Sequence, residues 1–268
     1  MIFNFSKLNF KKNQFVPSHR YIQIMILTID VGNTRIKGAV FEGDTLLNTF
    51  VFVKTELQKS IWGILKAHKE LTDLVIASVS DEEKQSFSVF NEAVNVHFVS
   101  PKDPFPFVNR YETPQTLGID RMVLVTGATL VYPNQNRLVI DAGTCVTYDF
   151  IDENDNYLGG AISLGLRLRY AALHNYTEKL PLLSLESPKH FIGNSTSESI
   201  HSGVVNGLAL EIDGFINQYK EQYSNFIIIL TGGDSEFLAN RLKNTIFANS
   251  NFLLESLNQT FQYKIEND

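Results

Sequence analysis

The chain has 268 residues, of which 44% are hydrophobic and 19% are charged, and its formal net charge is −6. This composition is typical of a soluble globular protein, and the length allows two small domains or one large one. The acidic balance gives no electrostatic reason to expect nucleic acid or an anionic membrane as a partner. No apolar run approaches the roughly 18 residues that a membrane span needs. The single cysteine, Cys145, excludes an internal disulfide and a cysteine-rich metal site, and it fits a reducing cytoplasm.

The first 24 residues differ from the rest of the chain. They carry several basic residues and scattered aromatic ones without a stable period, and they lack the apolar core of a signal peptide. Met25 stands directly before the first predicted strand. Residues 1–24 are therefore expected to be a disordered extension or a mis-assigned start.

Residues 26–41 predict a β-hairpin. An apolar run leads into Asp30, a turn holds Gly32, Asn33 and Thr34, and a second strand follows to Phe41. The backbone N–H groups of such a turn suit a phosphate, and Asp30 can hold Mg²⁺ directly or through water. An ordinary hairpin turn is the alternative, because Asn and Gly are common there.

The following segment predicts an α/β fold with a mixed sheet. Strands are expected at residues 46–53, 74–77 and 96–99, and helices at 56–68 and 81–93. Three prolines then open a loop over residues 101–115. Long loops over a rigid sheet are common places for binding residues.

Gly118 to Arg121 lies at the start of a helix that should be buried from Met122 to Val131. Asp120 and Arg121 are adjacent there. The pair has a simple alternative explanation, an acidic residue favoured by the helix dipole followed by a surface arginine.

A second hairpin repeats the first over residues 138–149. Asp141 aligns with Asp30 and Gly143 with Gly32, and a later buried strand ends in Gly232-Gly233 before a helix. Further helices are expected at 165–174, 235–244 and 251–262. A loop is expected at 180–194, and a long helix from Ser195 or Thr196 to about residue 223, with Glu198 near the offset of a capping box.

Taken together these motifs resemble the type III pantothenate kinases of the actin, sugar-kinase and heat-shock ATPase superfamily. The resemblance covers residues 26 to about 242, and each motif is weak alone, whereas the ordered set is specific. The matching segments are Asp30–Thr34, Gly118–Arg121, Asp141–Thr144, Gly159–Gly165 and Ile192–Thr196 leading into Ser202–Gly207.

The resemblance implies two related ribonuclease-H-like domains, residues 25–133 and 134–268, with a nucleotide in the cleft between them. It implies ATP-dependent phosphorylation of the primary hydroxyl of pantothenate to 4′-phosphopantothenate, the first step of coenzyme A biosynthesis, in a cytoplasmic homodimer. Two alternatives remain open. One is a kinase of the same superfamily for another small alcohol or acid, and the other is a non-catalytic relative that acts as a transcriptional activator.

The resemblance also implies roles for individual residues. Asp120 is the expected base, Asp141 the ligand of a monovalent cation (K⁺ or NH₄⁺), and Asp30 the contact to Mg²⁺ of the nucleotide. Cys145, although it neighbours this site, is given no role, because small buried cysteines usually only pack. The expected ATP-binding residues are Asp30, Val31, Gly32, Asn33, Thr34, Arg35, Ile36, Lys37, Gly143, Thr144, Gly232 and Gly233. The expected substrate-binding residues are Tyr111, Gly118, Ile119, Asp120, Arg121 and Thr196.

Overall fold

The computed structural model describes residues 24–32, 35–77 and 81–268. The expectation for the leader therefore lies almost wholly outside the described residues, as do the expected contacts of Asn33 and Thr34. Within the described ranges, no helix has the length and apolarity that crossing a bilayer requires.

The first sheet has five strands in the order β3-β2-β1-β4-β5. β1 pairs antiparallel with β2, and β2 with β3, whereas β4 and β5 run parallel to β1. The apolar cores of β1 and β4 explain their central place, because strands covered on both faces read as nearly continuous hydrophobic runs. The elements of this part are β1 (Met25–Val31), β2 (Ile36–Glu42), β3 (Thr45–Phe52), α1 (Leu57–Ala67), β4 (Leu71–Ala77), α2 (Asp81–Phe87) and β5 (Asn95–Phe98).

The second sheet repeats this topology. Its order is β11-β10-β7-β8-β9-β6, so β9-β8-β7-β10-β11 matches β3-β2-β1-β4-β5, with β6 added at the edge. The duplication inferred from the two hairpins is thus present in the strand order as well. The strands are β6 (Val108–Asn109), β7 (Asn136–Ala142), β8 (Cys145–Ile151), β9 (Asn156–Leu164), β10 (Phe226–Thr231) and β11 (Phe247–Ala248).

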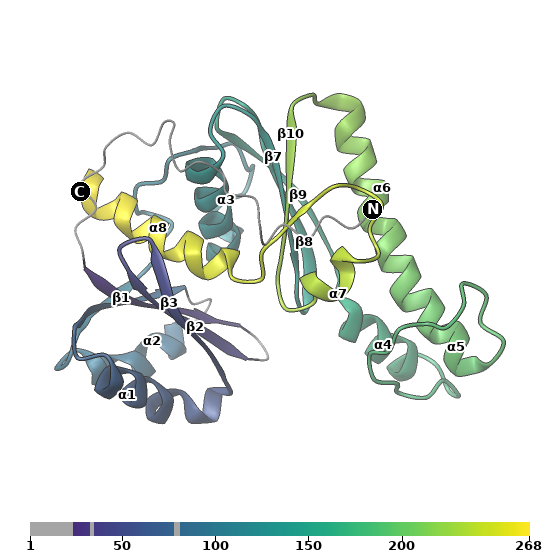
Figure 1. Cartoon of the computed structure of the whole chain (residues 1–268), viewed down its shortest axis with the longest axis horizontal. Helices are drawn as coiled ribbons and strands as arrows, with labels where there is room; N and C mark the ends of the chain where they lie inside the picture. Colours follow the sequence, from purple (N-terminus) through teal and green to yellow (C-terminus); the bar gives the residue numbers. More distant parts are fainter. Residues whose placement is uncertain (1–23, 33–34, 78–80) are drawn as a thin grey trace.

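Two helices cross between the sheets (Figure 1). α3 (Ile119–Val131) lies in the chain between β6 and β7 and packs on β7 and β8 of the same, second sheet. α8 (Phe252–Asn267) follows the last strand of the second sheet and returns to β1, β2 and β4 of the first. At their crossing, a Cβ on Gly127 would lie 1.9 Å from the Ser256 hydroxyl, so the helices approach closely because Gly127 has no side chain. A common core joins both sheets at this crossing. The division of the chain at residues 133/134 remains a prediction.

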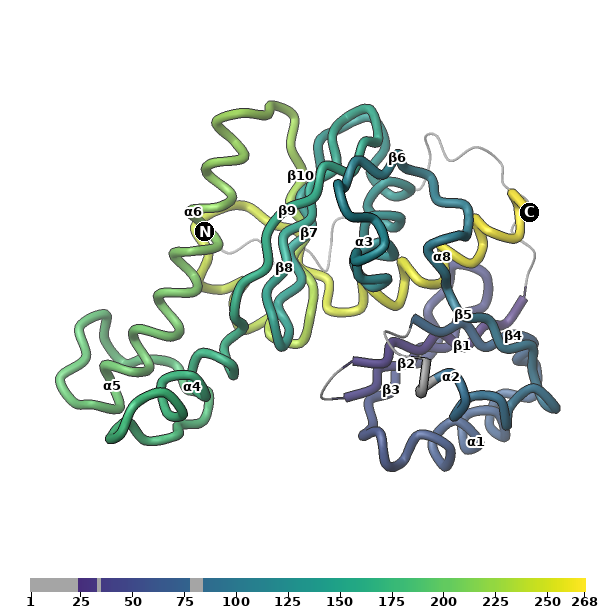
Figure 2. Tube along the Cα trace, turned by 180° about the vertical axis from the view of Figure 1, so that it is seen from behind, coloured from purple at the N-terminus to yellow at the C-terminus, as the bar shows by residue number. Residues whose placement is uncertain are grey.

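The other helices cover the outer faces. α1 and α2 pack on the first sheet, and α6 packs on the face of the second sheet opposite α3 (Figure 2). The remaining helices are α4 (Leu166–Asn175), α5 (Thr196–His201), α6 (Gly207–Gln222) and α7 (Ser235–Ala239).

Several helix boundaries differ from the sequence expectation. The helix expected at 81–93 ends at Phe87, α7 is shorter than 235–244, and α8 runs past 262 to Asn267. The long helix predicted from residue 195 or 196 is interrupted by a π-helical stretch at Ser202–Asn206. The wider π turn falls at a glycine and two β-branched residues, which have weaker helix propensity than the flanking sequence.

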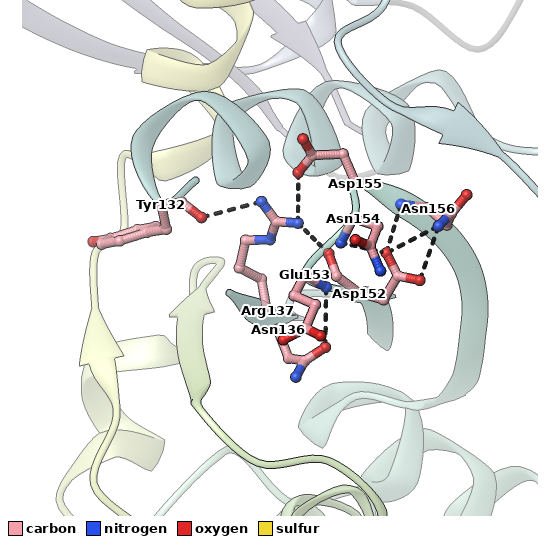
Figure 3. Close-up of polar contacts among 8 residues, drawn as sticks. All are labelled: Tyr132, Asn136, Arg137, Asp152, Glu153, Asn154, Asp155 and Asn156. Carbon is pink, nitrogen blue, oxygen red and sulfur yellow. Dashed lines mark hydrogen bonds and ion pairs between the residues drawn. The ribbon is translucent and has the colours of Figure 1, made fainter. Parts of the chain in front are cut away.

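Arg137, the second residue of β7, links three segments at that end of the second sheet (Figure 3). Its side chain is fully buried and donates to the Tyr132 carbonyl (3.1 Å), the Asp152 carbonyl and the Asp155 carboxylate (2.8 Å). The Asp155 carbonyl in turn accepts from Val108 N at 2.8 Å. The arginine therefore connects the end of α3, the β8–β9 turn and the segment that leads to Tyr111.

Candidate active site

The two hairpins place their aspartates at equivalent positions. Asp30 is the penultimate residue of β1, and Asp141 is the penultimate residue of β7. Asp30 pairs across the hairpin with Lys37, so both side chains lie on one face of the first sheet. The charge of Asp141 acts on Asp30, so the two carboxylates lie near each other although they belong to different sheets. A carboxylate from each half of the fold is thus brought to one place.

Burial dominates the electrostatics of these carboxylates. Burial, then the negative charges of Asp141 and Asp120, raise the pKa of Asp30 to about 7, although Lys37 opposes the shift. Burial raises the pKa of Asp141 to about 6, with Lys37 lowering it and Asp120 and Asp149 raising it. The charges of Asp120 and Lys37 act on both hairpin aspartates, and that of Asp141 acts on Asp30, so these four side chains form one electrostatic cluster. A bound cation would relieve the repulsion among its carboxylates.

This cluster predicts a pH-dependent stability of the nucleotide-free protein. A carboxyl group whose pKa is raised on folding stabilises the fold fully below its unfolded pKa, near about 4, and that stabilisation is lost as the pH rises through about 7. The Asp30→Asn variant lacks this titration. Its melting temperature should therefore exceed that of the unsubstituted protein at about pH 8, and the difference should shrink toward about pH 4. Thermal melts in metal-free buffer check this, and a difference independent of pH would contradict it.

Oxygen atoms without hydrogen-bond partners surround Asp141. It pairs in register with Thr147 on β8 and with Thr231 on β10, so the three side chains lie on the same face. The hydroxyls of Thr147 and Thr231 are buried and have no hydrogen-bond partner among the described residues. Carboxylate and hydroxyl oxygens are the donors that hard cations take, so this set fits a monovalent cation.

The late glycine turn packs directly against the second hairpin. Gly232 has φ +95°, and a Cβ there would lie 2.3 Å from Asp141 Oδ1 and 2.4 Å from the Ala142 carbonyl. The following turn is closed by Asp234 N donating to the Ala142 carbonyl at 3.0 Å. Gly233, by contrast, faces open space, with nothing within 4 Å of a Cβ built there. The close packing requires glycine at 232, and the open side at 233 leaves room for a ligand.

Two of the predicted ATP-binding residues have buried side chains. Val31 and Ile36 flank the first turn, but their side chains lie in the core of the first sheet. Contact with a nucleotide there would come from the backbone. Arg35 is exposed, and the second turn is closed by Gly143 N donating to the Cys145 carbonyl at 2.9 Å. Cys145 is exposed, contrary to the expectation of a small buried cysteine.

Asp120 lies in the first turn of α3, as predicted. Its Oδ1 accepts from the backbone N–H of Arg121 at 2.9 Å. A Cβ on Gly118 would lie 2.4 Å from that oxygen, so glycine at this position leaves room for the carboxylate. The Ile119 side chain packs into the core, where it fixes the start of the helix. The carboxylate is therefore held by the helix start and coupled electrostatically to Asp30 and Asp141.

Arg121 is not the surface residue that the simple explanation of this segment assumed. It is 6% exposed and forms an ion pair with Asp149, with Nε and Nη2 each 2.8 Å from Asp149 Oδ1. Its guanidinium lies 5.6 Å from the centre of the Tyr111 ring, which stacks on Tyr157. Sequence reasoning missed Asp149 and Tyr157. An acidic residue inside the apolar strand 145–151 was the available signal, because a buried carboxylate requires a partner.

Thr196 lies apart from the other predicted substrate residues. It opens α5, which lies at the far end of the second half from α3 in both views (Figures 1 and 2). There it lines a cavity with Leu173, Leu180 and Ile200. Ser195 caps the helix by accepting from Glu198 N at 3.2 Å, whereas the Glu198 carboxylate accepts from Lys189 N, so the capping box is half formed. Within one chain, Thr196 and Asp120 do not meet.

The duplicated sheets, the crossing helices α3 and α8 between them, and the equivalent Asp hairpins define an actin-like ATPase and sugar-kinase fold. Among solved structures of this class, a conserved putative Baf family transcriptional activator from Campylobacter jejuni matches with a TM-score of 0.60 and 19% identity, over 90% of this chain and 99% of that chain. MreB5 of Spiroplasma citri bound to ADP matches with a TM-score of 0.51 and 12% identity, over 91% and 99%. At these identities the likeness concerns the fold alone.

The chain belongs to the type III pantothenate kinase family, whose model matches residues 26–218. A type III pantothenate kinase of Flavobacterium johnsoniae is 70% identical over 244 residues, which are 91% of this chain and 100% of the relative. That of Flavobacterium psychrophilum is 60% identical over 240 residues, 90% and 100% respectively. That of Christiangramia forsetii is 42% identical over 239 residues, 89% and 98%.

Proposed function

We propose that this protein transfers the γ-phosphoryl group of ATP to the primary hydroxyl of pantothenate, which yields 4′-phosphopantothenate in the first step of coenzyme A biosynthesis. The observation that carries the proposal is that Asp30 and Asp141 hold equivalent positions in the two duplicated hairpins, with Asp120 at the start of α3 near enough for its charge to act on both. Phosphoryl transfer requires placement of the nucleotide, neutralisation of phosphate charge and a group that orients the attacking hydroxyl. Family membership supplies the substrate, because the relatives carry this name.

The hairpins form the nucleotide side of the site. Backbone N–H groups of the turns after Asp30 and Asp141 bind the phosphates, and Lys37 adds a positive charge. Gly233 leaves space for the adenosine. Asp30 holds the nucleotide's Mg²⁺ directly or through water, because carboxylate oxygens and waters are the ligands that Mg²⁺ takes. Bound Mg²⁺ neutralises charge on the phosphates.

The start of α3 forms the substrate side. Asp120 accepts the proton of the attacking hydroxyl, and Arg121 and Tyr111 bind the substrate's polar groups. Nε and Nη2 of the Arg121 guanidinium bind Asp149, whereas its Nη1 takes no part in that ion pair. Arginine presents its donors in a rigid plane, so one edge can be fixed by the protein while the other recognises a carbonyl or carboxylate.

The position of Thr196 is an argument for a homodimer. If Thr196 binds the substrate, as its match to the family motif implies, it reaches Asp120 only from a second copy, because the two lie apart in one chain (Figure 1). Each active site would then combine Asp120 of one protomer with Thr196 of its partner. The single cysteine of the chain supports a cytoplasmic location.

A coupled assay of ADP release tests the proposed function. Pantothenate is compared with glycerol, acetate and a panel of hexoses at equal concentrations, in Mg²⁺ and potassium. Turnover with pantothenate and with none of the other acceptors supports the proposal. Turnover with another acceptor indicates a different kinase of the same fold, and no turnover with any acceptor leaves the non-catalytic alternative.

Activity should depend on potassium or ammonium. Asp141, with the Thr147 and Thr231 hydroxyls beside it, supplies the oxygen ligands, and loss of the cation should leave the second phosphate cradle with an unneutralised carboxylate. The protein is dialysed into sodium or Tris buffer, and KCl is then titrated back. Turnover that stays undiminished without either cation would mean that Asp141 has only a structural role.

A further inference from the structure

A carboxylate lies in the interior of the second sheet, next to the substrate side of the site. Asp149 sits in the middle of β8 and is completely buried. Its Oδ1 accepts from Nε and Nη2 of Arg121, each at 2.8 Å, and from the Tyr157 hydroxyl at 2.7 Å. Three donors from two elements thus converge on one oxygen atom.

This arrangement fixes the Arg121 side chain more completely than it satisfies the hydrogen-bonding capacity of the Asp149 carboxylate. Asp149 Oδ2 is buried and has no hydrogen-bond partner in the described part of the chain, although a carboxylate placed for stability would have both oxygens satisfied. Burial lowers the pKa of the Arg121 guanidinium, but the charge and hydrogen bond of Asp149 outweigh that effect and raise it above its ordinary value. Arg121 is therefore held charged and in one orientation.

The same cluster fixes Tyr111. Its ring stacks on Tyr157, with centroids 6.1 Å apart and planes inclined by 22°. Two residues after Tyr157 in β9, a Cβ on Gly159 would lie 3.1 Å from the Tyr111 ring, so the strand backbone itself packs against that ring. The Tyr111 backbone N–H donates to the Asn109 side chain at 2.9 Å. Tyr157 thus contacts the Tyr111 ring directly and is linked to Arg121 through Asp149, and both Tyr111 and Arg121 are expected substrate-binding residues.

We propose that Asp149 and Tyr157 are positioning residues for pantothenate recognition, a proposal that rests on the proposed function. Asp149 fixes the Arg121 guanidinium by one edge, and Tyr157 orients Asp149 and supports the Tyr111 ring. Neither touches the substrate. Their effect passes through Arg121 and Tyr111, so it falls on pantothenate binding and leaves the nucleotide side unchanged.

The sharpest variant is Tyr157→Phe, which removes one hydroxyl and keeps the aromatic stack. Tyr148→Phe is the matched control, because Tyr148 is also fully buried, adjoins Asp149 on the opposite face of β8, and has its hydroxyl 3.4 Å from Glu211. A hydrogen bond to a charged group that aligns the binding residue should be worth about tenfold in KM for pantothenate. The KM for ATP and kcat should stay within about twofold, and Tyr148→Phe should leave all three unchanged.

A second measurement separates positioning from general loosening of the fold. Tyr157→Phe is combined with Arg121→Ala and compared with Arg121→Ala alone. If Tyr157 acts through Arg121, its removal should add less than about twofold to the KM for pantothenate once the arginine is gone. Asp149→Asn, which keeps the shape but loses the charge, should raise that KM more than Tyr157→Phe does.

Three results would overturn the proposal. One is an unchanged KM for pantothenate in Tyr157→Phe, with the unsubstituted enzyme active on pantothenate, which refutes the positioning role and leaves the proposed function standing. Another is full additivity with Arg121→Ala, which makes Tyr157 a structural residue only. A third is absence of pantothenate turnover in the unsubstituted protein, which removes the proposed function and this inference together.

Discussion

Replacement of Asp120 by asparagine should lower kcat by about 10²–10⁴-fold, the range that general-base catalysis supplies. Asparagine keeps the shape of the side chain and can still accept from the Arg121 backbone N–H through its carbonyl oxygen. It cannot take a proton. The hairpins at Asp30 and Asp141 are untouched, so ATP binding should survive. Steady-state kinetics with pantothenate, together with a direct measurement of nucleotide binding, check both parts.

Arg121→Ala is the control for this substitution, since it alters the neighbouring residue of the same helix turn. It should mainly raise the KM for pantothenate, because it removes binding that is present in both the ground state and the transition state. If Asp120→Asn instead keeps kcat and loses substrate affinity, Asp120 orients the hydroxyl and does not accept its proton. The loose transition state of phosphoryl transfer makes that outcome chemically reasonable.

Replacement of Arg137 by alanine should destabilise the protein by about 3–5 kcal/mol, because each buried acceptor left without a donor costs about 1–3 kcal/mol. The fully buried guanidinium serves the carbonyls of Tyr132 and Asp152 (Figure 3). Its ion pair with Asp155 contributes less, because that carboxylate side chain is 40% exposed. Urea unfolding followed by circular dichroism measures the change.

Arg110→Ala is the matched control for Arg137. Arg110 is exposed, and its Nε donates at 3.1 Å to the side chain of Asn156, the first residue of β9 after the same β8–β9 turn. Its loss should cost less than about 1 kcal/mol, the usual limit for an exposed polar contact. Equal destabilisation by the two variants would show that the buried carbonyls find other donors when Arg137 is absent.

The sequence by itself determined the local framework of this protein. Apolar runs, the Asp-x-Gly turns and the Gly-Gly turn predicted both hairpins and their duplication, because turn chemistry and strand periodicity act over a few residues. The position of Asp120 at a helix start was predicted for the same reason. The ordered set of motifs resembles the type III pantothenate kinases, and the comparisons confirmed membership of that family.

Tertiary structure decided what lies next to these motifs. The sequence does not say that α8 returns to the first sheet, or that Asp149 on β8 fixes Arg121 on α3, because such contacts join residues far apart in the chain and leave no local period. Helix boundaries were misjudged where packing overrode propensity, as in the π-helical stretch inside the predicted long helix. The family resemblance assigns Thr196 to the pantothenate substrate, and only the fold shows that, within one chain, α5 lies far from the start of α3 (Figure 1). Local patterns identify the residues that carry the chemistry, and the long-range packing of helices on sheets sets which of them meet.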